Sequence, residues 1–352
     1  MLPFAAVPIL QASRDARSAA YARVVPGRTL HFPDDEGSHP DFKTEWWYAT
    51  GWLTDEAKRP MGFQITFYRT RAVDLRGNPS RFAPEQIVIA HAALSDPERG
   101  HLLHDQRIAR AGFGLADAAQ GKTDIKIDNW YLRTQGETML ALVTGRELRF
   151  ELTLRPTQPP LLHGDHGFSR KGSAPESASF YYTLPQLAVD GGVYAEGRTT
   201  RITGTAWFDH EWSTAPMESE ATGWEWIGIN LDDGSVLMAF RIRSRSGDPL
   251  WAGATLRSAD GRTKTFAPQE VGWQPIRNWR SDRTGTSYPV AWRVYVGDFV
   301  IDLEPLMDDQ EHDARISTGT VYWEGAVTVR SGDRSIGRGY LELTGYWRAF
   351  RL

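Results

Sequence analysis

The feature that most constrains the fold is a strand-rich pattern that occurs twice along the 352-residue chain. Residues 45–55, EWWYATGWLTD, align with residues 223–233, GWEWIGINLDD. Further matches follow in the same order in both halves: Phe67 with Phe240, Leu94 with Leu256, Phe150 with Phe299, Tyr181 with Tyr322, Gly204 with Gly345 and Trp207 with Trp347. The spacing between partners falls along the chain, which indicates shorter loops in the second copy. An internal repeat of this kind predicts two domains of one architecture.

The repeat also suggests where the domains begin and end. We predict a first domain over residues 28–213 and a second over residues 222–352, joined by a linker at 214–221 that has no periodicity. Residues 1–27 are predicted to be a leader, either a disordered tail or the remnant of an export signal. Met1–Ala12, MLPFAAVPILQA, supplies a short apolar stretch but lacks the leading positive charges of a complete signal.

Each copy is built from short segments in which apolar and polar residues alternate. Segments such as Phe63–Phe67 and Val236–Phe240 lie between clusters of Gly, Pro, Asn and Asp, a pattern typical of half-buried strands. The best helix candidate, Asp105–Ala119, is weakened by Gly112 and Gly114. About eight strands per copy would close a barrel and leave no exposed sheet edge. We therefore predict an all-β fold of two antiparallel barrels, which either fill with side chains or, as in lipocalins, enclose one apolar ligand.

Composition and missing motifs exclude several functions. A net charge of −4, without a Lys/Arg-rich run, gives no reason to expect a nucleic acid as partner. The absence of cysteine excludes disulfides, thiolate catalysis and Cys-based metal sites. The sequence contains no G-x-S-x-G, G-x-G-x-x-G or H-E-x-x-H motif. The Gly-rich stretch Gly164–Gly172, GDHGFSRKG, is interpreted as a flexible connection.

An acidic pair interrupts the last strand of the first copy. In residues 207–212, WFDHEW, alternation places Trp207, Asp209 and Glu211 on one face of the strand. The second copy ends in residues 346–350, YWRAF, so we expect the acidic pair in the first copy alone. A carboxyl group among aromatic rings loses the solvation of its charged form, and its raised pKa makes it a proton donor near neutral pH. The alternative is a structural salt bridge to an arginine of the other domain.

Two further polar groups lie in apolar surroundings. Glu45 precedes an aromatic run on the first strand, and His91 shares a strand face with Ile87 and Ile89. A histidine in such a place is more often a hydrogen-bonded core residue than a ligand. Zinc ligation by His91, His210 and a carboxylate is conceivable, but no pair has metal-like spacing, so we predict no metal site.

Five segments together resemble a known family: residues 32–39, 44–48, 164–172, 206–213 and 322–325. They are similar to the AttH-like family, also called the carotenoid 1,2-hydratase or hydroxyneurosporene synthase family. The resemblance extends from about Phe32 to Trp347. It implies a pair of lipocalin-like (calycin) barrels, an apolar ligand and export to the periplasm. For the characterised hydratases it also implies addition of water to a terminal isoprenoid double bond, without a cofactor.

The resemblance assigns roles to particular residues. Asp209 would be the acid that protonates the alkene, and Glu211 or His210 would orient the water. Protonation gives a tertiary carbocation, which needs a negative or aromatic surround. The substrate-binding set is then Glu45, Trp46, Tyr48, His91, Trp207, Trp212, Trp224 and Trp226.

A non-catalytic periplasmic protein that binds or transfers a lipid is the alternative to a hydro-lyase, because a shared fold does not fix a function. Peripheral association with a membrane is compatible with either. The sequence leaves the oligomeric state open.

Overall fold

The computed structural model describes residues 21–350, apart from 72–79, 81, 83, 196 and 216. The described chain folds into 23 β-strands and two short 3-10 helices, Asp34–Glu36 and Pro268–Glu270. The strands form two large antiparallel sheets, so the prediction of an all-β, lipocalin-like fold is confirmed. Among the described residues no helix has the length and apolar character that a bilayer crossing requires.

The first sheet has the strand order β4-β3-β2-β1-β13-β12-β9-β8-β7-β6-β5, with β10 and β11 paired to β12. Its strands are β1 (Thr44–Asp55), β2 (Pro60–Arg71), β3 (Gln86–Ser95), β4 (Leu103–Arg110), β5 (Ala116–Ala118), β6 (Asp124–Ile127), β7 (Trp130–Gln135), β8 (Thr138–Thr144), β9 (Leu148–Arg155), β10 (Leu161–Leu162), β11 (Phe168–Arg170), β12 (Ala178–Ala195) and β13 (Arg198–Ala215).

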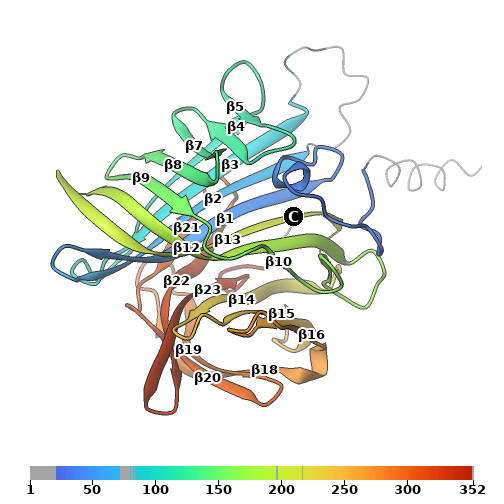
Figure 1. Cartoon of the computed structure of the whole chain (residues 1–352), viewed down its shortest axis with the longest axis vertical. Helices are drawn as coiled ribbons and strands as arrows, with labels where there is room; N and C mark the ends of the chain where they lie inside the picture. Colours follow the sequence, from blue (N-terminus) through green and yellow to red (C-terminus); the bar gives the residue numbers. More distant parts are fainter. Residues whose placement is uncertain are drawn as a thin grey trace, which may run out of the picture.

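The second sheet has the order β17-β16-β15-β14-β23-β22-β20-β19-β18, with β21 paired to β22. Its strands are β14 (Ala221–Leu231), β15 (Val236–Ser244), β16 (Pro249–Arg257), β17 (Thr263–Phe266), β18 (Val271–Arg280), β19 (Ser287–Val296), β20 (Phe299–Pro305), β21 (Glu311–Ala314), β22 (Thr320–Ser331) and β23 (Arg334–Thr344). In both sheets, therefore, the first strand pairs with the last. Figure 1 shows the first sheet in the upper part of the molecule and the second below it.

The first sheet curls so that its edge strand β4 approaches the far side of the sheet. The guanidinium of Arg107 on β4 donates to the carbonyl of Thr144 at 3.1 Å, and the carboxylate of Asp105 accepts from the backbone N–H of Arg146 at 2.8 Å. Side chains of β4 therefore reach the end of β8, on the far side of the same sheet. The helix candidate at Asp105–Ala119 is not a helix: the segment contains most of β4 and all of β5, joined by a turn in which Gly112 and Gly114 have φ values of +90° and +78°.

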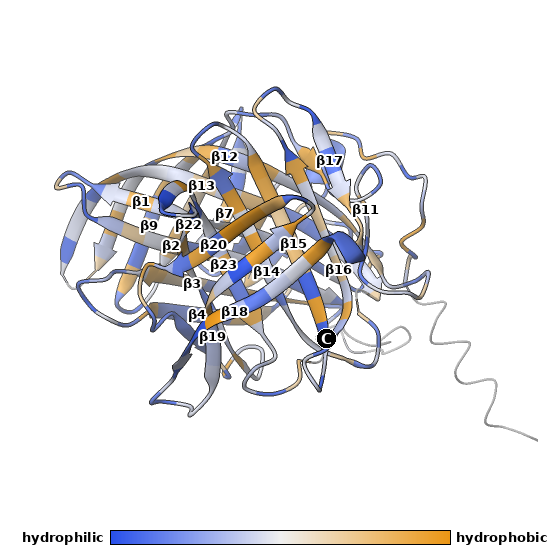
Figure 2. Cartoon of the chain, turned by 90° about the horizontal axis from the view of Figure 1, so that it is seen from below, coloured by the Kyte–Doolittle hydropathy of each residue, from blue (hydrophilic) through white to orange (hydrophobic). Residues whose placement is uncertain are grey.

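Apolar side chains form one core inside each sheet and a third cluster between them. Hydrophobic residues are accordingly gathered on the strands, while most turns are hydrophilic (Figure 2). Several hydrogen bonds join the halves; among them, the indole of Trp52 donates to the carbonyl of Gly339 at 2.9 Å, and the amide of Asn230 donates to the carbonyl of Ala206 at 3.2 Å. Gly228 permits this packing, because a Cβ there would lie 2.8 Å from the ring of Trp207.

The bounds of the strands can be compared with the domain bounds and the repeat alignment predicted from the sequence. The first sheet ends at Ala215 and the second begins at Ala221. Val24 is buried in the first core, so the packed chain begins before Arg28, whereas Met1–Ala12 lies outside the described residues. The sheets do not reproduce the match of Trp207 with Trp347, because Trp207 lies within β13 and Trp347 follows the end of β23.

Candidate functional site

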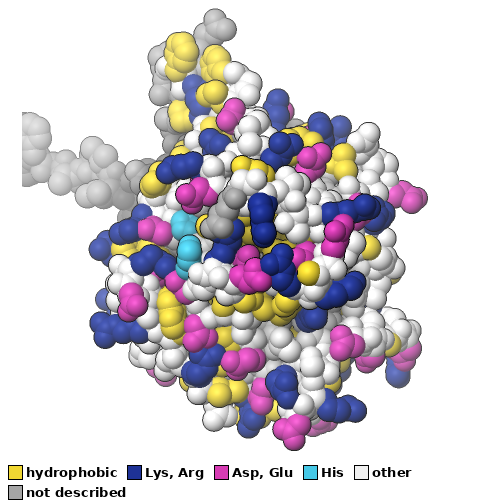
Figure 3. All heavy atoms as spheres, turned by 90° about the vertical axis from the view of Figure 1, so that its left-hand side faces the viewer, with side chains coloured by type: hydrophobic (Ala, Val, Ile, Leu, Met, Phe, Trp, Pro, Cys, Tyr) yellow, Lys and Arg dark blue, Asp and Glu magenta, His cyan; other side chains and the backbone are white. Residues whose placement is uncertain are grey.

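A cavity of about 200 Å³ lies between the two halves and is lined mainly by apolar and aromatic side chains. The alternation predicted for β13 directs Asp209 and Glu211 into this cavity, and it directs Phe208, His210 and Trp212 to the opposite, buried face of the strand. Seven of the residues predicted from the sequence line it: Trp46, Tyr48, His91, Asp209, Glu211, Trp224 and Trp226. The surface outside is mixed in charge, and Figure 3 shows Lys/Arg and Asp/Glu side chains interspersed over one face.

Asp209 is a buried carboxyl group in the cavity wall. Its side chain is buried, and its two oxygens accept hydrogen bonds from the hydroxyl of Tyr181 at 2.7 Å, the indole N–H of Trp207 at 2.8 Å and the hydroxyl of Thr183. Burial disfavours the charged form and outweighs these donors, with Glu211 adding like-charge repulsion. The pKa of Asp209 is therefore raised to about 7. A carboxyl group with this pKa can both hold and release a proton near neutral pH.

A hydrogen-bonded chain leads away from Asp209 into the first half. The Nε2 atom of His163 lies 2.6 Å from the hydroxyl oxygen of Thr183, which contacts Asp209. Burial lowers the pKa of His163 well below its usual value, so the ring is neutral and its Nε2 can act as donor or acceptor. When Asp209 is protonated it can donate to Thr183, and Thr183 can donate to His163. The chain therefore accommodates both protonation states of Asp209.

Glu211 lies two residues further along the same face of β13, and its negative charge is paired with a lysine. The ammonium of Lys171 lies 3.1 Å from its carboxylate and also lies over the rings of Tyr181 and Phe240, at 4.7 and 4.3 Å from their centroids. Lys171 belongs to the Gly-rich stretch Gly164–Gly172, which was predicted to be only a connection. That interpretation is wrong at this residue, because Lys171 is buried in the cavity wall.

The second half contributes two more carboxyl groups, which the sequence analysis missed. Glu324 on β22 and Glu342 on β23 line the cavity and are direct partners in the strand register. The expectation that acidic residues occur only in the first copy is therefore wrong. The sequence alignment matched Trp207 with Trp347 and therefore did not show that Glu342 corresponds to Asp209. In the strand register Glu342 lies opposite Trp226, as Asp209 lies opposite Tyr48.

Aromatic rings from both halves cover the remaining wall. The ring of Trp46 lies 5.0 Å from Tyr68, and that of Tyr48 lies 5.4 Å from Trp226 in an edge-to-face arrangement. The indole of Trp226 also donates to Tyr181 at 3.0 Å. The wall thus offers ring faces to a ligand, together with the hydroxyl of Tyr48, which has no hydrogen-bond partner among the described residues.

His91 lines the cavity but has both ring nitrogens occupied. Its Nδ1 lies 2.7 Å from the hydroxyl of Tyr322 and its Nε2 lies 2.8 Å from that of Ser317, both in the second half. Burial lowers its pKa to about 3, so the ring is neutral at physiological pH. His91 therefore joins the two halves and offers a ligand only the surface of its ring.

The fold and the sequence both have counterparts among known proteins. A family model described as AttH-like matches residues 23–346. This chain belongs to the AttH-like family. The structure of an AttH protein from Nitrosomonas europaea is 49% identical, has a TM-score of 0.87, and the match covers 92% of this chain and 99% of that one.

Two more distant relatives carry enzyme names. Kievitone hydratase from Nectria haematococca is 14% identical with a TM-score of 0.71, and the match covers 93% of this chain and 97% of that one, a likeness that shows the shared fold. The dehydratase asqC of Emericella nidulans is 24% identical over 249 residues. That match spans 66% of each chain, just under two thirds of the relative's length.

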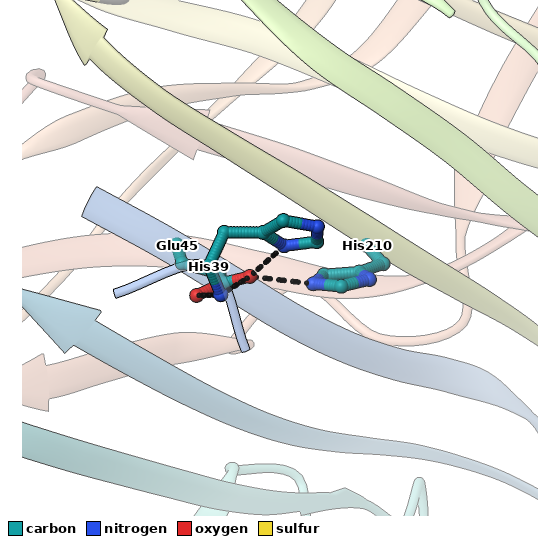
Figure 4. Close-up of side chains that lie close together, drawn as sticks. All are labelled: His39, Glu45 and His210. Carbon is teal, nitrogen blue, oxygen red and sulfur yellow. Dashed lines mark hydrogen bonds and ion pairs between the residues drawn. The ribbon is translucent and has the colours of Figure 1, made fainter. Parts of the chain in front are cut away.

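In this family member, four other predicted site residues lie outside the cavity lining, and one of them, Trp207, donates its indole N–H to Asp209 from beside the cavity. Glu45, His210 and Trp212 point into the first half from the opposite faces of β1 and β13, where they are buried. The carboxylate of Glu45 lies 2.9 Å from His210 and 2.7 Å from His39 (Figure 4). It also lies 2.9 Å from the guanidinium of Arg69. From there His210 cannot orient a water molecule in the cavity.

The same cluster contains the residue types that bind a metal ion. One ligand atom from each of His39, Glu45 and His210 lies within 4.8 Å of the others. However, the guanidinium of Arg69 is ion-paired with Glu45, and the ring of His39 stacks on Trp212 at 3.8 Å between centroids. A dication would face this fixed positive charge at close range. The arrangement fits a buried ion-pair network, in which the histidines and Arg69 lower the pKa of Glu45 despite its burial.

Proposed function

We propose that this protein is a cofactor-independent hydro-lyase that adds water to, or removes it from, a carbon–carbon double bond of a hydrophobic compound. The observation that supports this most directly is Asp209, a carboxyl group with a pKa of about 7 in an aromatic cavity between the halves. Protonation of an alkene requires an acid that is poorly solvated and still protonated near neutral pH. The enzyme names of the distant relatives, a hydratase and a dehydratase, agree with this chemistry.

In the proposed reaction, Asp209 transfers its proton to one carbon of the double bond and becomes a carboxylate. The neighbouring carbon becomes a carbocation, which the faces of Trp46 and Trp226 and the carboxylate of Glu211 stabilise. A water oxygen then forms the new bond to this carbon and loses a proton to a carboxylate in the cavity wall. Dehydration follows the same steps in reverse. Lys171 holds Glu211 in place, since its ammonium lies 3.1 Å from that carboxylate.

We propose an isoprenoid as the substrate class, because protonation of its trisubstituted double bond gives a tertiary cation. The cavity, of about 200 Å³, suits a short isoprenoid or one end of a longer one. Both citronellol and lycopene contain the terminal double bond in question and serve as probes.

The test is incubation of each probe with the protein in oxygen-18 water, followed by mass spectrometry of the products. Wild type should incorporate the label into a tertiary alcohol, and Asp209→Asn should not, while still binding the probe. Asp298→Asn, which changes an exposed aspartate in the turn between β19 and β20, is the matched control and should behave as wild type. Binding of both probes by wild type without any labelled product would contradict the proposal and favour a lipid-binding protein.

A further inference from the structure

The carboxyl pair of the second half has no counter-charge. Glu324 and Glu342 lie directly opposite each other on β22 and β23, and among the described residues neither forms a salt bridge. Glu342 accepts a hydrogen bond from the hydroxyl of Thr344 at 2.9 Å. Glu324 is buried, and its Oε1 has no hydrogen-bond partner within the described chain. A buried, unpartnered carboxyl oxygen at a cavity wall indicates a place for a polar ligand atom.

Two neighbouring carboxyl groups in such surroundings cannot both be ionised. Burial, together with the like charge of its neighbour, raises the pKa of Glu324 well above its usual value. Burial also raises the pKa of Glu342, to about 7. At neutral pH the pair therefore retains at least one proton and can exchange it.

One member of the pair and the acid of the first half are both influenced by the charge of Glu211. The negative charge of Glu211 on β13 helps to raise the pKa of both Asp209 and Glu342, so the ionisation of Glu211 affects carboxyl groups of both halves. Other titratable groups that face the pair are the hydroxyls of Tyr322 and Tyr340, whose pKa values are raised by burial. Asp209 of the first half and the glutamate pair of the second half therefore line the same cavity.

We propose that the Glu324–Glu342 pair binds the reacting water molecule and accepts the proton that it loses. This inference rests on the proposed hydro-lyase function and assigns its second proton-transfer group. Asp209 gives a proton to one alkene carbon; the water oxygen bonds to the adjacent carbon; and the water proton passes to the ionised member of the pair. Return of that proton to Asp209, through solvent or Glu211, restores the starting state. In dehydration the pair protonates the leaving hydroxyl group and Asp209 takes the proton from carbon.

The first test measures the pair without turnover. In protein labelled with carbon-13 at the glutamate side-chain carboxyls, NMR titration should show coupled titration of Glu324 and Glu342 near or above neutral pH. Glu342→Gln should remove one titration and shift the other. Glu137→Gln, in an exposed turn, should change neither. Titration of both groups at ordinary glutamate values would overturn the inference, whether or not the protein is a hydro-lyase.

The second test measures the pH profile of oxygen-18 incorporation into citronellol and lycopene. Glu324→Gln and Glu342→Gln should each lower the rate by roughly 10²-fold or more, and should flatten the limb of the profile that depends on an ionised base. The melting temperatures of both variants report whether they fold. Unchanged rates and profiles in folded variants, with Asp209→Asn inactive, would overturn this inference alone. Absence of labelled product in wild type would instead overturn the proposed function and, with it, this role of the pair.

Discussion

Replacement of Asp209 by asparagine should stabilise the protein at neutral and alkaline pH while it removes catalysis. The native pKa of Asp209 is about 7, whereas its ordinary value is 3.8. Below the ordinary value both folded and unfolded chains hold the proton, and the group has no effect on stability. Between the two values the unfolded chain releases the proton first, so the free energy of unfolding falls as pH rises. Above about pH 7 the ionised, buried carboxylate costs the native state roughly 4 kcal/mol.

Asparagine is close in shape and does not titrate, so it removes this cost. Its carbonyl oxygen can still accept hydrogen bonds from Trp207 and Thr183. Its NH₂ group, however, faces the hydroxyl of Tyr181, which in the wild type donates to the carboxylate and so loses its acceptor. One mispaired buried hydroxyl costs about 1 to 2 kcal/mol. The expected net gain is therefore about 2 to 3 kcal/mol above pH 7 and turns into a small loss in acid. Loss of a general acid should lower the rate by roughly 10²- to 10⁴-fold.

Thermal unfolding of both proteins, followed by calorimetry from about pH 5 to about pH 8, measures the effect. The difference in melting temperature between variant and wild type should grow with pH and level off above neutrality. Asp298→Asn controls for the loss of one negative charge and should show no such trend. A difference that is the same at every pH would refute a raised native pKa for Asp209, and with it the main physical argument for this residue as the acid.

Three further predictions concern the cavity wall, the buried ion pair and the interface. Trp46→Ala should weaken binding of citronellol by roughly 5- to 100-fold through loss of apolar contact, as measured by fluorescence titration. Trp279 is half-buried and lies outside the cavity, so the control Trp279→Ala should leave the affinity for citronellol unchanged. Arg69→Met should destabilise the fold by about 3 to 5 kcal/mol in urea, because it leaves the buried charge of Glu45 without its guanidinium partner; a smaller change than about 1 kcal/mol would contradict a paired charge there. His312 on β21 lies at the interface, where its ring is 4.8 Å from that of His91 and 4.4 Å from that of His104 in the first half. Its pKa is lowered by burial, so its contribution to stability is present above its ordinary value of 6.5 and is lost as pH falls below it. His312→Phe should therefore reduce the loss of melting temperature between neutral and mildly acidic pH, and equal losses in both proteins would count against a neutral buried histidine.

Much of the fold could be predicted because it depends on local patterns. Period-two alternation in segments such as Phe63–Phe67 identified strands, and the same alternation in β13 separated Asp209 and Glu211 from His210. The helix candidate at Asp105–Ala119 failed because its two glycines with positive φ form a turn between strands. The match of Trp207 with Trp347 failed because short strands resemble one another and a shift along the chain leaves the pattern intact.

The sequence by itself determined the all-β architecture and the acidic, aromatic face of β13, since strand geometry makes alternate residues share a face. Only the tertiary structure decided that the cavity lies between the halves, that Lys171 pairs with Glu211, and that Glu324 and Glu342 face the same space. It also decided the protonation of Asp209. The physical reason is that desolvation of a carboxyl group depends on everything packed around it, and here residues from both halves enclose the cavity that Asp209 lines.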